Sequence, residues 1–293
     1  MLSPSAQRVF EMLCTGAGSA QLFICPSKQR RQVARIPIMP QAFHNAFRKI
    51  ARAGEQLAHL EREIGEFVED DCYKISVEPD PQHPGCELHK AKLIRFMAPC
   101  IRELAASVAE SLRDALDEAV AVVAAASGAV NASSQRFLFA DSAEGFEEGI
   151  EAHAEQIPVE IRALLRGFQP YNGGNDLLFA LNLLCNAGER ALLAAIGTVL
   201  LRPYTRFVIS GYLGIEIPER PVWNRTEDEI VFLRAPADAK LDYEIDFGLY
   251  VALDKIDPFD GQPVLRILEA CGAETHRVVS RIEAEARRLS IVL

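Results

Sequence analysis

The sequence feature that most constrains the fold is a stretch near the middle of the chain, Gln169–Arg190. Its first residues, Gln169 to Gly174, read as a turn, because proline cannot continue a helix and two glycines add backbone freedom. Nearly every residue from Leu177 to Cys185 is then apolar. A helix that is apolar on almost all sides is usually buried. We therefore predict a central helix here, with the other helices around it.

A single polar stripe interrupts this apolar surface. Helical periodicity places Asn175, Asn182, Asn186 and then Glu189 or Arg190 on one line. Two interpretations stay open. The stripe is the solvent edge of the helix or satisfies buried backbone groups, or it lines a pocket shared with another helix. Asparagine can position a ligand but cannot act as a general acid or base near neutral pH, which limits the chemistry that the stripe could perform alone.

Three long segments have apolar residues at helical spacing: Gln41–Asp70, Pro99 to about Ala126, and Pro263–Leu289. The middle one carries a charged face on which Arg113 and Asp117 are four residues apart and can pair. This face is either simply solvated or part of a site. Shorter helical pieces are predicted at residues 142–149 and 158–166.

Strand patterns flank the helical part of the chain. Cys72–Val77 and Glu87–Phe96 are separated by a segment rich in proline and glycine, which predicts an antiparallel hairpin with an exposed loop. Further strands are predicted at residues 207–213, 229–234 and 243–253, whereas Leu192–Leu201 is ambiguous between a helix end and a strand. These patterns predict an α+β protein: a bundle of long helices packed beside an antiparallel β-sheet, with a C-terminal helix.

The N-terminal residues differ in composition from the rest. Residues 1–38 carry five basic side chains against Glu11 alone, and we expect them to form a loosely ordered basic extension. A single α+β domain is expected over residues 39–293, helical from about 41 to 190, with the sheet and the closing helix from about 191 to 293. Met39 precedes the first strong helix, so translation from Met39 is an alternative that mass spectrometry of the native N-terminus would test.

Charge and cysteine content restrict the compartment and the partners. The formal net charge of -10 argues against a dedicated nucleic-acid binder, although a local basic patch could be hidden in it. No apolar run reaches the roughly 18 residues that span a bilayer, and the start lacks the pattern of a secretory signal. Seven scattered cysteines without a C-x-x-C pair are typical of reduced thiols, so we expect a cytoplasmic protein.

No motif predicts a cofactor or a metal. The sequence has no P-loop, no G-x-G-x-x-G and no G-x-S-x-G. His83 and His89 flank Cys86, but the spacing and the turn-rich surroundings favour an exposed hairpin loop over a metal site.

The second long helix contains the sequence Leu112-Arg113-Asp114-Ala115-Leu116-Asp117, which resembles the "LRSALDH" helix of a broad group of uncharacterised bacterial proteins. In those proteins "QPY-GG" and then "N-DKHR" follow. The present chain has Gln169-Pro170-Tyr171 with Gly173-Gly174, and then Asn186-Ala187-Gly188-Glu189-Arg190, and its order of elements from about Phe43 to Leu289 is similar. The Arg-x4-His pattern of that helix is also similar to HEPN-type domains, many of which are RNA-cleaving toxins or their relatives.

The departures from this pattern bear on catalysis. Glu118 stands where the group has the histidine after Leu-Asp, and Gly188-Glu189-Arg190-Ala191 stands where it has "DKHR". Metal-independent RNA cleavage needs a group that exchanges protons near neutral pH, usually histidine. Glu118 could substitute only if burial raised its pKa. The resemblance therefore implies a member that has lost a catalytic pair.

We therefore expect a non-catalytic intracellular protein that acts through binding or assembly, with a degenerate site between two helices. A HEPN-like metal-independent endoribonuclease and a small-molecule-binding protein with a pocket between the Arg113 and Asn182 faces are the alternatives, and a homo-oligomer is left open. The candidate residues for a pocket or an interhelical network are Arg113, Asp117, Glu118, Gln169, Tyr171, Asn175, Asn182, Asn186 and Arg190.

Overall fold

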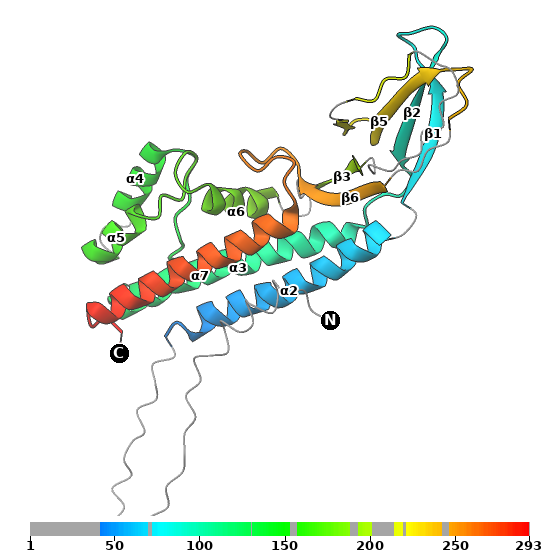
Figure 1. Cartoon of the computed structure of the whole chain (residues 1–293). Coiled ribbons are helices and arrows are strands. Elements are labelled where there is room, and N and C mark those ends of the chain that lie inside the picture. The colour runs from blue at the N-terminus through cyan, green and yellow to red at the C-terminus, as the bar shows by residue number, and fades with distance from the viewer. Residues whose placement is uncertain are drawn as a thin grey trace, which may run out of the picture. The chain divides into compact units, whose positions relative to one another are not determined.

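Three long amphipathic helices lie side by side in the computed structural model (Figure 1). They are α2 (His44–Glu69), α3 (Pro99–Ala126) and α7 (Val264–Arg288). Helix α3 begins at Pro99, which suits the first helical position because the N–H that proline lacks would have no helical partner there. Helix α2 runs antiparallel to α3, and α7 runs parallel to α3 (Figure 1).

The structure describes residues 42–69, 72–129, 131–152, 157–187, 193–200, 214–218, 221–241 and 246–292. These residues belong to one unit, Ala42–Leu293. The expectations for residues 1–38, for Met39 and for a strand at 207–213 lie outside the described residues.

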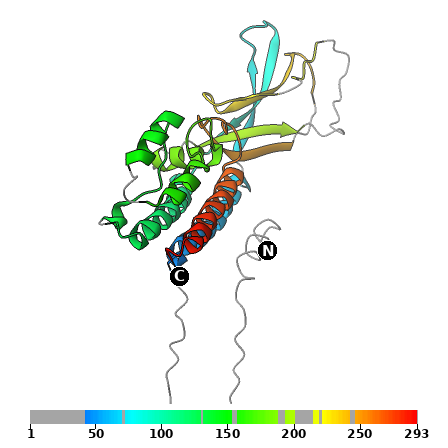
Figure 2. The ribbon, with the colours of Figure 1, turned by 90° about the vertical axis from the view of Figure 1, so that its left-hand side faces the viewer.

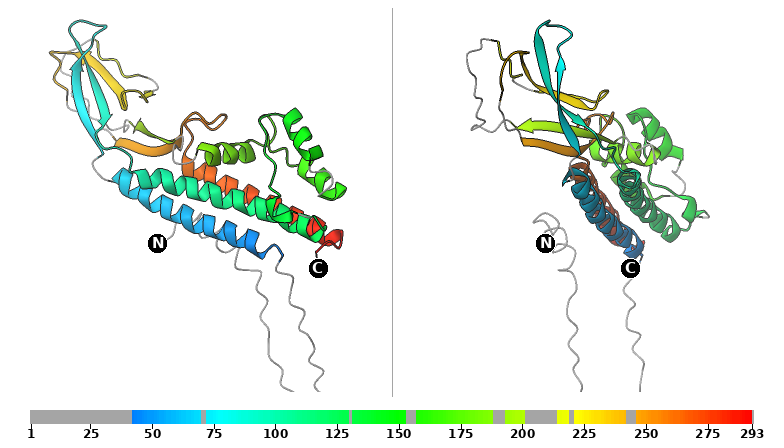
Figure 3. Two further views of the ribbon diagram at one scale, coloured as in Figure 1. Left: turned by 180° about the vertical axis from the view of Figure 1, so that it is seen from behind. Right: turned by 90° about the vertical axis from the view of Figure 1, so that its right-hand side faces the viewer.

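The apolar helix of the central stretch, α6 (Asp176–Ala187), is present and packs against α3 and α7. It lies on the side of α3 and α7 away from α2, as Figure 3 shows from behind. Helices α3 and α7, and not α6, are therefore the central elements of the bundle, because each of them contacts α2, α6 and the other. Helix α6 is apolar nearly all round because α3, α7 and other apolar side chains of the same core cover much of its surface.

Two shorter helices, α4 (Ala143–Ala152) and α5 (Val159–Arg166), precede α6, and a single 3-10 turn, η1 (Ala132–Ser134), follows α3. Each short helix buries only two side chains, Phe146 and Ile150 from α4 and Ile161 and Leu165 from α5. The helical half of the fold thus shares one apolar core.

The strands within the described residues form two antiparallel sheets. Four strands lie in the order β1-β2-β5-β4, and two more, β3 and β6, pair with each other. The bounds are Tyr73–Pro79 for β1, Cys86–Leu93 for β2, Leu193–Leu200 for β3, Trp223–Asn224 for β4, Glu229–Pro236 for β5 and Asp246–Leu253 for β6. The predicted α+β class is confirmed, and the ambiguous segment after α6 is a strand.

A second, smaller apolar core joins the two sheets. It includes Ile196 of β3, Trp223 of β4 and Ile230 of β5. The β3–β6 pair lies between the long helices and the four-stranded sheet, which Figure 2 shows from the side. Leu193, Leu249 and Val251 of this pair belong to the helical core. The pair therefore contributes side chains to both cores.

No helix in the described ranges is both long and apolar enough to cross a bilayer.

Candidate functional site

Arg113 and Asn186 of the predicted network lie in contact. The Arg113 guanidinium donates to Asn186 Oδ1 at 3.0 Å, which links α3 to the last turn of α6. The same guanidinium lies 5.2 Å from the centre of the Phe139 ring, in a cation–π arrangement. Asn186 in turn donates to Asn182 Oδ1 at 3.4 Å. Asn186 of the polar stripe thus meets the charged face of α3, and Asn182 supports Asn186 from within α6.

Asp117 is buried one turn further along α3, with 8% of its surface exposed. One carboxylate oxygen accepts the Phe137 backbone N–H at 2.8 Å, and the other accepts Arg136 at 3.3 Å. Burial raises the pKa of Asp117, and the Phe137 N–H, Arg136 and Arg113 oppose that rise. Both oxygens are therefore held by groups of the chain itself.

Glu118 points to another neighbour. Its carboxylate accepts Lys49 of α2 at 3.1 Å, so it takes part in the α2–α3 contact and not in the Arg113–Asn186 contact. Its side chain is 29% exposed, and Lys49 also lies 4.0 Å from Asp114. The expectation for Arg190 lies outside the described residues.

Asn175 caps α6 and ties it to α7. Its Oδ1 accepts the Leu178 N–H at 3.2 Å, and its Nδ2 donates to Glu274 of α7 at 2.6 Å. Glu274 is paired with Arg277 on the same helix. The Arg277 hydrogen bond, aided by Asn175, lowers the pKa of Glu274. Asn175 thus lies at the start of α6, whereas Asn182 and Asn186 lie further along the helix.

Gln169 and Tyr171 shape the turn before α6. Gln169 adopts a positive φ of 51°, and its carbonyl accepts the N–H groups of Tyr171 and Asn175 at 2.8 and 2.7 Å. The Tyr171 ring packs against Phe146, 5.5 Å between centres, and its backbone forms a bridge with Ala140. Gln169 thus holds the turn through its own backbone, whereas Tyr171 ties the turn to α4 and to Ala140.

These contacts converge on one segment, Arg136–Ala140, which we call the clamped segment. Asp117 holds the N–H of Phe137, Arg113 lies over Phe139, and Tyr171 pairs with Ala140. Asp117, Arg113 and Tyr171, which belong to the pattern of the bacterial group, therefore contact the same segment of the chain. The apolar run Phe137–Phe139 predicts a short buried anchor, and Phe137 is indeed buried, but nothing in the sequence marks this segment as a partner for α3.

The histidines whose contacts are described lie elsewhere. His59 pairs with Glu63, His83 with Asp80, and the His276 ring lies beside Phe47. The His89 ring lies near Phe232 in the sheet. Among the described residues, no cluster of three or more His, Cys, Asp or Glu side chains could hold a metal ion.

Cysteine chemistry is also disfavoured beside the Arg113 contact. Cys185 lies one residue from Asn186, and burial raises the pKa of its thiol to about 12, although Arg113 acts in the opposite direction. A thiol with so high a pKa stays protonated and is a weak nucleophile at neutral pH.

A shallow cavity of about 280 Å³ lies between α2 and α3 and contains none of the predicted residues. It is lined by His59, Glu63, Cys100, Glu103, Leu104 and Ser107. The Cys100 thiol donates to Glu63 at 3.4 Å, and burial together with that carboxylate raises the pKa of Cys100. No sequence signal indicated this cavity, because its residues come from two helices without a shared motif.

Comparison with known proteins finds no family model, no curated protein and no solved structure that matches this chain. The resemblance to the bacterial group and to HEPN-type domains therefore stays a prediction from the quoted residues.

Proposed function

We propose that the protein acts in the cytoplasm through binding and assembly, and not through catalysis. The observation that carries this proposal is the state of Asp117, whose two carboxylate oxygens are taken by Phe137 and Arg136 while the residue is 8% exposed. A catalytic carboxylate must reach a proton on its substrate. Asp117 instead fastens the clamped segment to α3.

The other groups of the resembling motif support the same conclusion. Arg113 donates to Asn186 and lies over Phe139, so its guanidinium binds side chains of the same protein. Glu118, at the position of the missing histidine, accepts Lys49. That carboxylate is thus engaged in the ion pair between α2 and α3. These contacts support a role of the motif in joining helices to one another.

The cysteines support a reducing compartment. In the described part of the chain, the structure shows free thiols at Cys86, Cys100, Cys185 and Cys271. Free thiols persist where cellular reductants keep them reduced, as in the cytoplasm.

Incubation with RNA tests the non-catalytic role. Purified full-length protein and the Arg113→Ala variant are each incubated with total cellular RNA, without and with a metal chelator, and the RNA lengths are compared over time. We expect no cleavage by either protein. Arg136→Ala is the matched control, since it also removes one positive charge next to Asp117. Cleavage by the parent that Arg113→Ala abolishes and Arg136→Ala retains would overturn the proposal in favour of a HEPN-like ribonuclease.

A further inference from the structure

Strand β1 forms one edge of the four-stranded sheet, and β2 is its only strand partner among the described residues. The hydrogen bonds at its two ends fix which backbone groups face β2. Ile94 N donates to Cys72 O at 2.8 Å, and Asp80 N donates to Cys86 O at 2.8 Å. Because the backbone N–H and C=O groups of successive residues point to opposite sides of a strand, the even-numbered residues bond to β2. The groups that point away from the sheet belong to Tyr73, Ile75 and Val77, with the Pro79 carbonyl after them.

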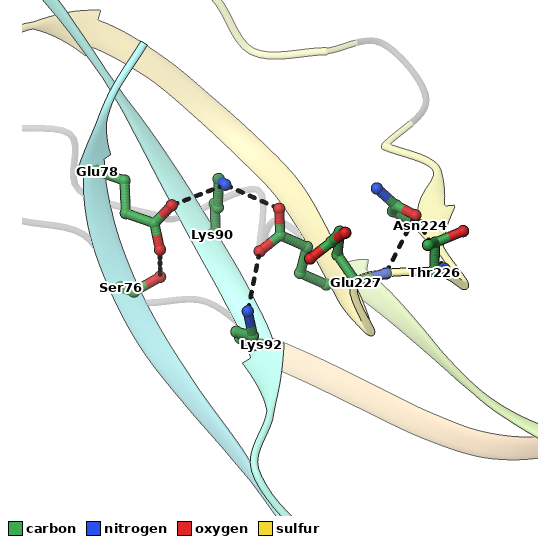
Figure 4. Close-up of polar contacts among 8 residues, drawn as sticks. Ser76, Glu78, Lys90, Lys92, Asn224, Thr226 and Glu227 are labelled. Carbon is green, nitrogen blue, oxygen red and sulfur yellow. Dashed lines mark hydrogen bonds and ion pairs between the residues drawn. The ribbon is translucent and has the colours of Figure 1, made fainter. Parts of the chain in front are cut away.

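The side chains of the even-numbered residues share one face of β1 and carry opposite charges at its two ends. Lys74, Ser76 and Glu78 follow one another on this face. Figure 4 shows Glu78 bonded to Lys90 of β2. Lys90 also donates to Glu229 of β5 at 2.8 Å. Lys74, by contrast, lies directly opposite Lys92 of β2 in the strand register. Two like charges opposite each other destabilise a pair of strands.

We propose that β1 pairs with β1 of a second copy of this chain, antiparallel and across a twofold axis at Ser76. In this register Ile75 lies opposite Val77 of the second copy, and Lys74 lies opposite Glu78 of the second copy. Each contact occurs twice because the interface is symmetric. Two four-stranded sheets then join into one continuous sheet.

The outward-facing backbone N–H and C=O groups of β1 fit this register. The outward groups of Ile75 and Val77 face one another, and together with Tyr73 and the Pro79 carbonyl they form about six hydrogen bonds across the axis. Ser76 and the Lys74–Glu78 pairs fall at the non-hydrogen-bonded positions, where the side chains of opposite residues lie closest. Each Lys74 thereby gains a carboxylate partner across the axis, while Lys92 stays opposite it on β2.

Other registers of the same parity lose this match. A slip by two residues places Ser76 opposite Lys74 or Glu78, and a slip by four places Lys74 opposite Lys74 or Glu78 opposite Glu78. A slip by one residue sets the outward-facing residues of one strand opposite inward-facing residues of the other, so their donors and acceptors no longer meet. Charge thus selects the register centred on Ser76.

The opposite face of β1 also gains from the pairing. Val77 is β-branched, and 48% of its surface is exposed in the single chain. In the proposed register it packs beside Ile75 of the second copy, and pairs of β-branched residues stabilise neighbouring strands. The dimer therefore covers an apolar side chain that one chain leaves open.

Sedimentation velocity of the full-length protein over a concentration series tests the charge match. We expect a dimer, and we expect Lys74→Glu to raise its dissociation constant about 10- to 30-fold, because two attractive pairs become two repulsive ones. Glu78→Lys is also expected to raise the dissociation constant of the dimer. The double variant Lys74→Glu/Glu78→Lys restores opposite charges across the axis and is expected to return the dissociation constant toward the parent value.

Two position-specific variants test the register. Proline at Val77 removes only an outward N–H, which an edge strand tolerates, so Val77→Pro is expected to keep the fold and weaken the dimer. Cysteine at Ser76 faces its own copy at a Cα separation of about 4.5 Å, within reach of a disulfide. Ser76→Cys is therefore expected to form a crosslinked dimer under mild oxidation, whereas Val77→Cys and the parent, which carries the native cysteines, stay uncrosslinked.

A monomer at every concentration would overturn the inference. So would a dimer that is unaffected by both Lys74→Glu and Val77→Pro in variants whose circular dichroism matches the parent. Equal crosslinking of Ser76→Cys and Val77→Cys would refute the register. The inference goes beyond the proposed function, since RNA cleavage would leave the dimer in place and a monomer would leave a non-catalytic binding role untouched.

Discussion

At the scale of single residues, Asp117 shows how a motif that resembles a catalytic one can serve structure. Its carboxylate is held between a backbone N–H and Arg136, and burial raises its pKa. Alanine at this position leaves the Phe137 N–H without its acceptor, and an unsatisfied buried donor costs about 1–3 kcal/mol. We expect Asp117→Ala to lower the free energy of unfolding by that amount at pH 7, measured by urea denaturation.

Asparagine at the same position separates the hydrogen bond from the charge. Asp117→Asn keeps an oxygen for the Phe137 N–H, so we expect its stability at pH 7 to lie close to that of the parent. Because the folded-state pKa of Asp117 is raised, the folded parent binds a proton more tightly than the unfolded chain. The parent should therefore gain stability relative to Asp117→Asn as pH falls toward about 4. A difference that grows with rising pH would contradict this assignment.

At the residue scale, the sequence predicts only some of the contacts of this network. The spacing on α3 and α6 identified Arg113, Asn182 and Asn186, which do lie together. The partners Lys49, Phe139 and Glu274 could not be found, because each comes from a segment far away in the chain. Helical periodicity predicts which side chains lie on the same face of a helix, but it does not predict which other element packs against that face.

At the scale of elements, one side chain at the start of α6 combines a helix cap with a contact to another helix. Asn175 both caps the helix and donates to Glu274 of α7. Asn175→Ser keeps the capping oxygen and loses the bond to α7, whereas Asn175→Ala loses both. We expect the alanine variant to cost about 1 kcal/mol more than the serine variant, because that is the usual value of a cap. Thermal unfolding of both variants measures the difference, and equal losses would assign the whole effect to the Glu274 contact.

The elements themselves were predictable to different degrees. Helices α2, α3 and α7 follow from apolar residues at a spacing of 3.6, a pattern that each helix carries within its own sequence. Strand β3 was ambiguous because its pairing with β6 joins residues about 50 positions apart, which no local pattern reveals. Ile94 and Phe96, predicted as strand, are exposed residues beyond the end of β2.

At the scale of the unit Ala42–Leu293, the two apolar cores meet at the β3–β6 pair, where Gly197 of β3 lies against aromatic rings. A Cβ atom at Gly197 would lie 2.3 Å from the Trp223 ring and 2.4 Å from the Phe247 ring. Those rings pack against each other with 6.0 Å between centres, so neither can withdraw without opening the second core. Glycine is thus required here because the side chains of two sheets leave no room for a methyl group.

We therefore expect Gly197→Ala to lower the free energy of unfolding by about 1–3 kcal/mol, the usual cost of overpacking a core. Gly54→Ala is the matched control, since Gly54 lies on α2 with no heavy atom within 4 Å of the added Cβ. That change should stabilise the protein by about 0.5–1 kcal/mol, because alanine favours a helix over glycine. Urea denaturation of both variants measures the two effects. Stabilisation by both would show that the sheets are not packed tightly at Gly197, and the link between the two cores would then have to be placed elsewhere.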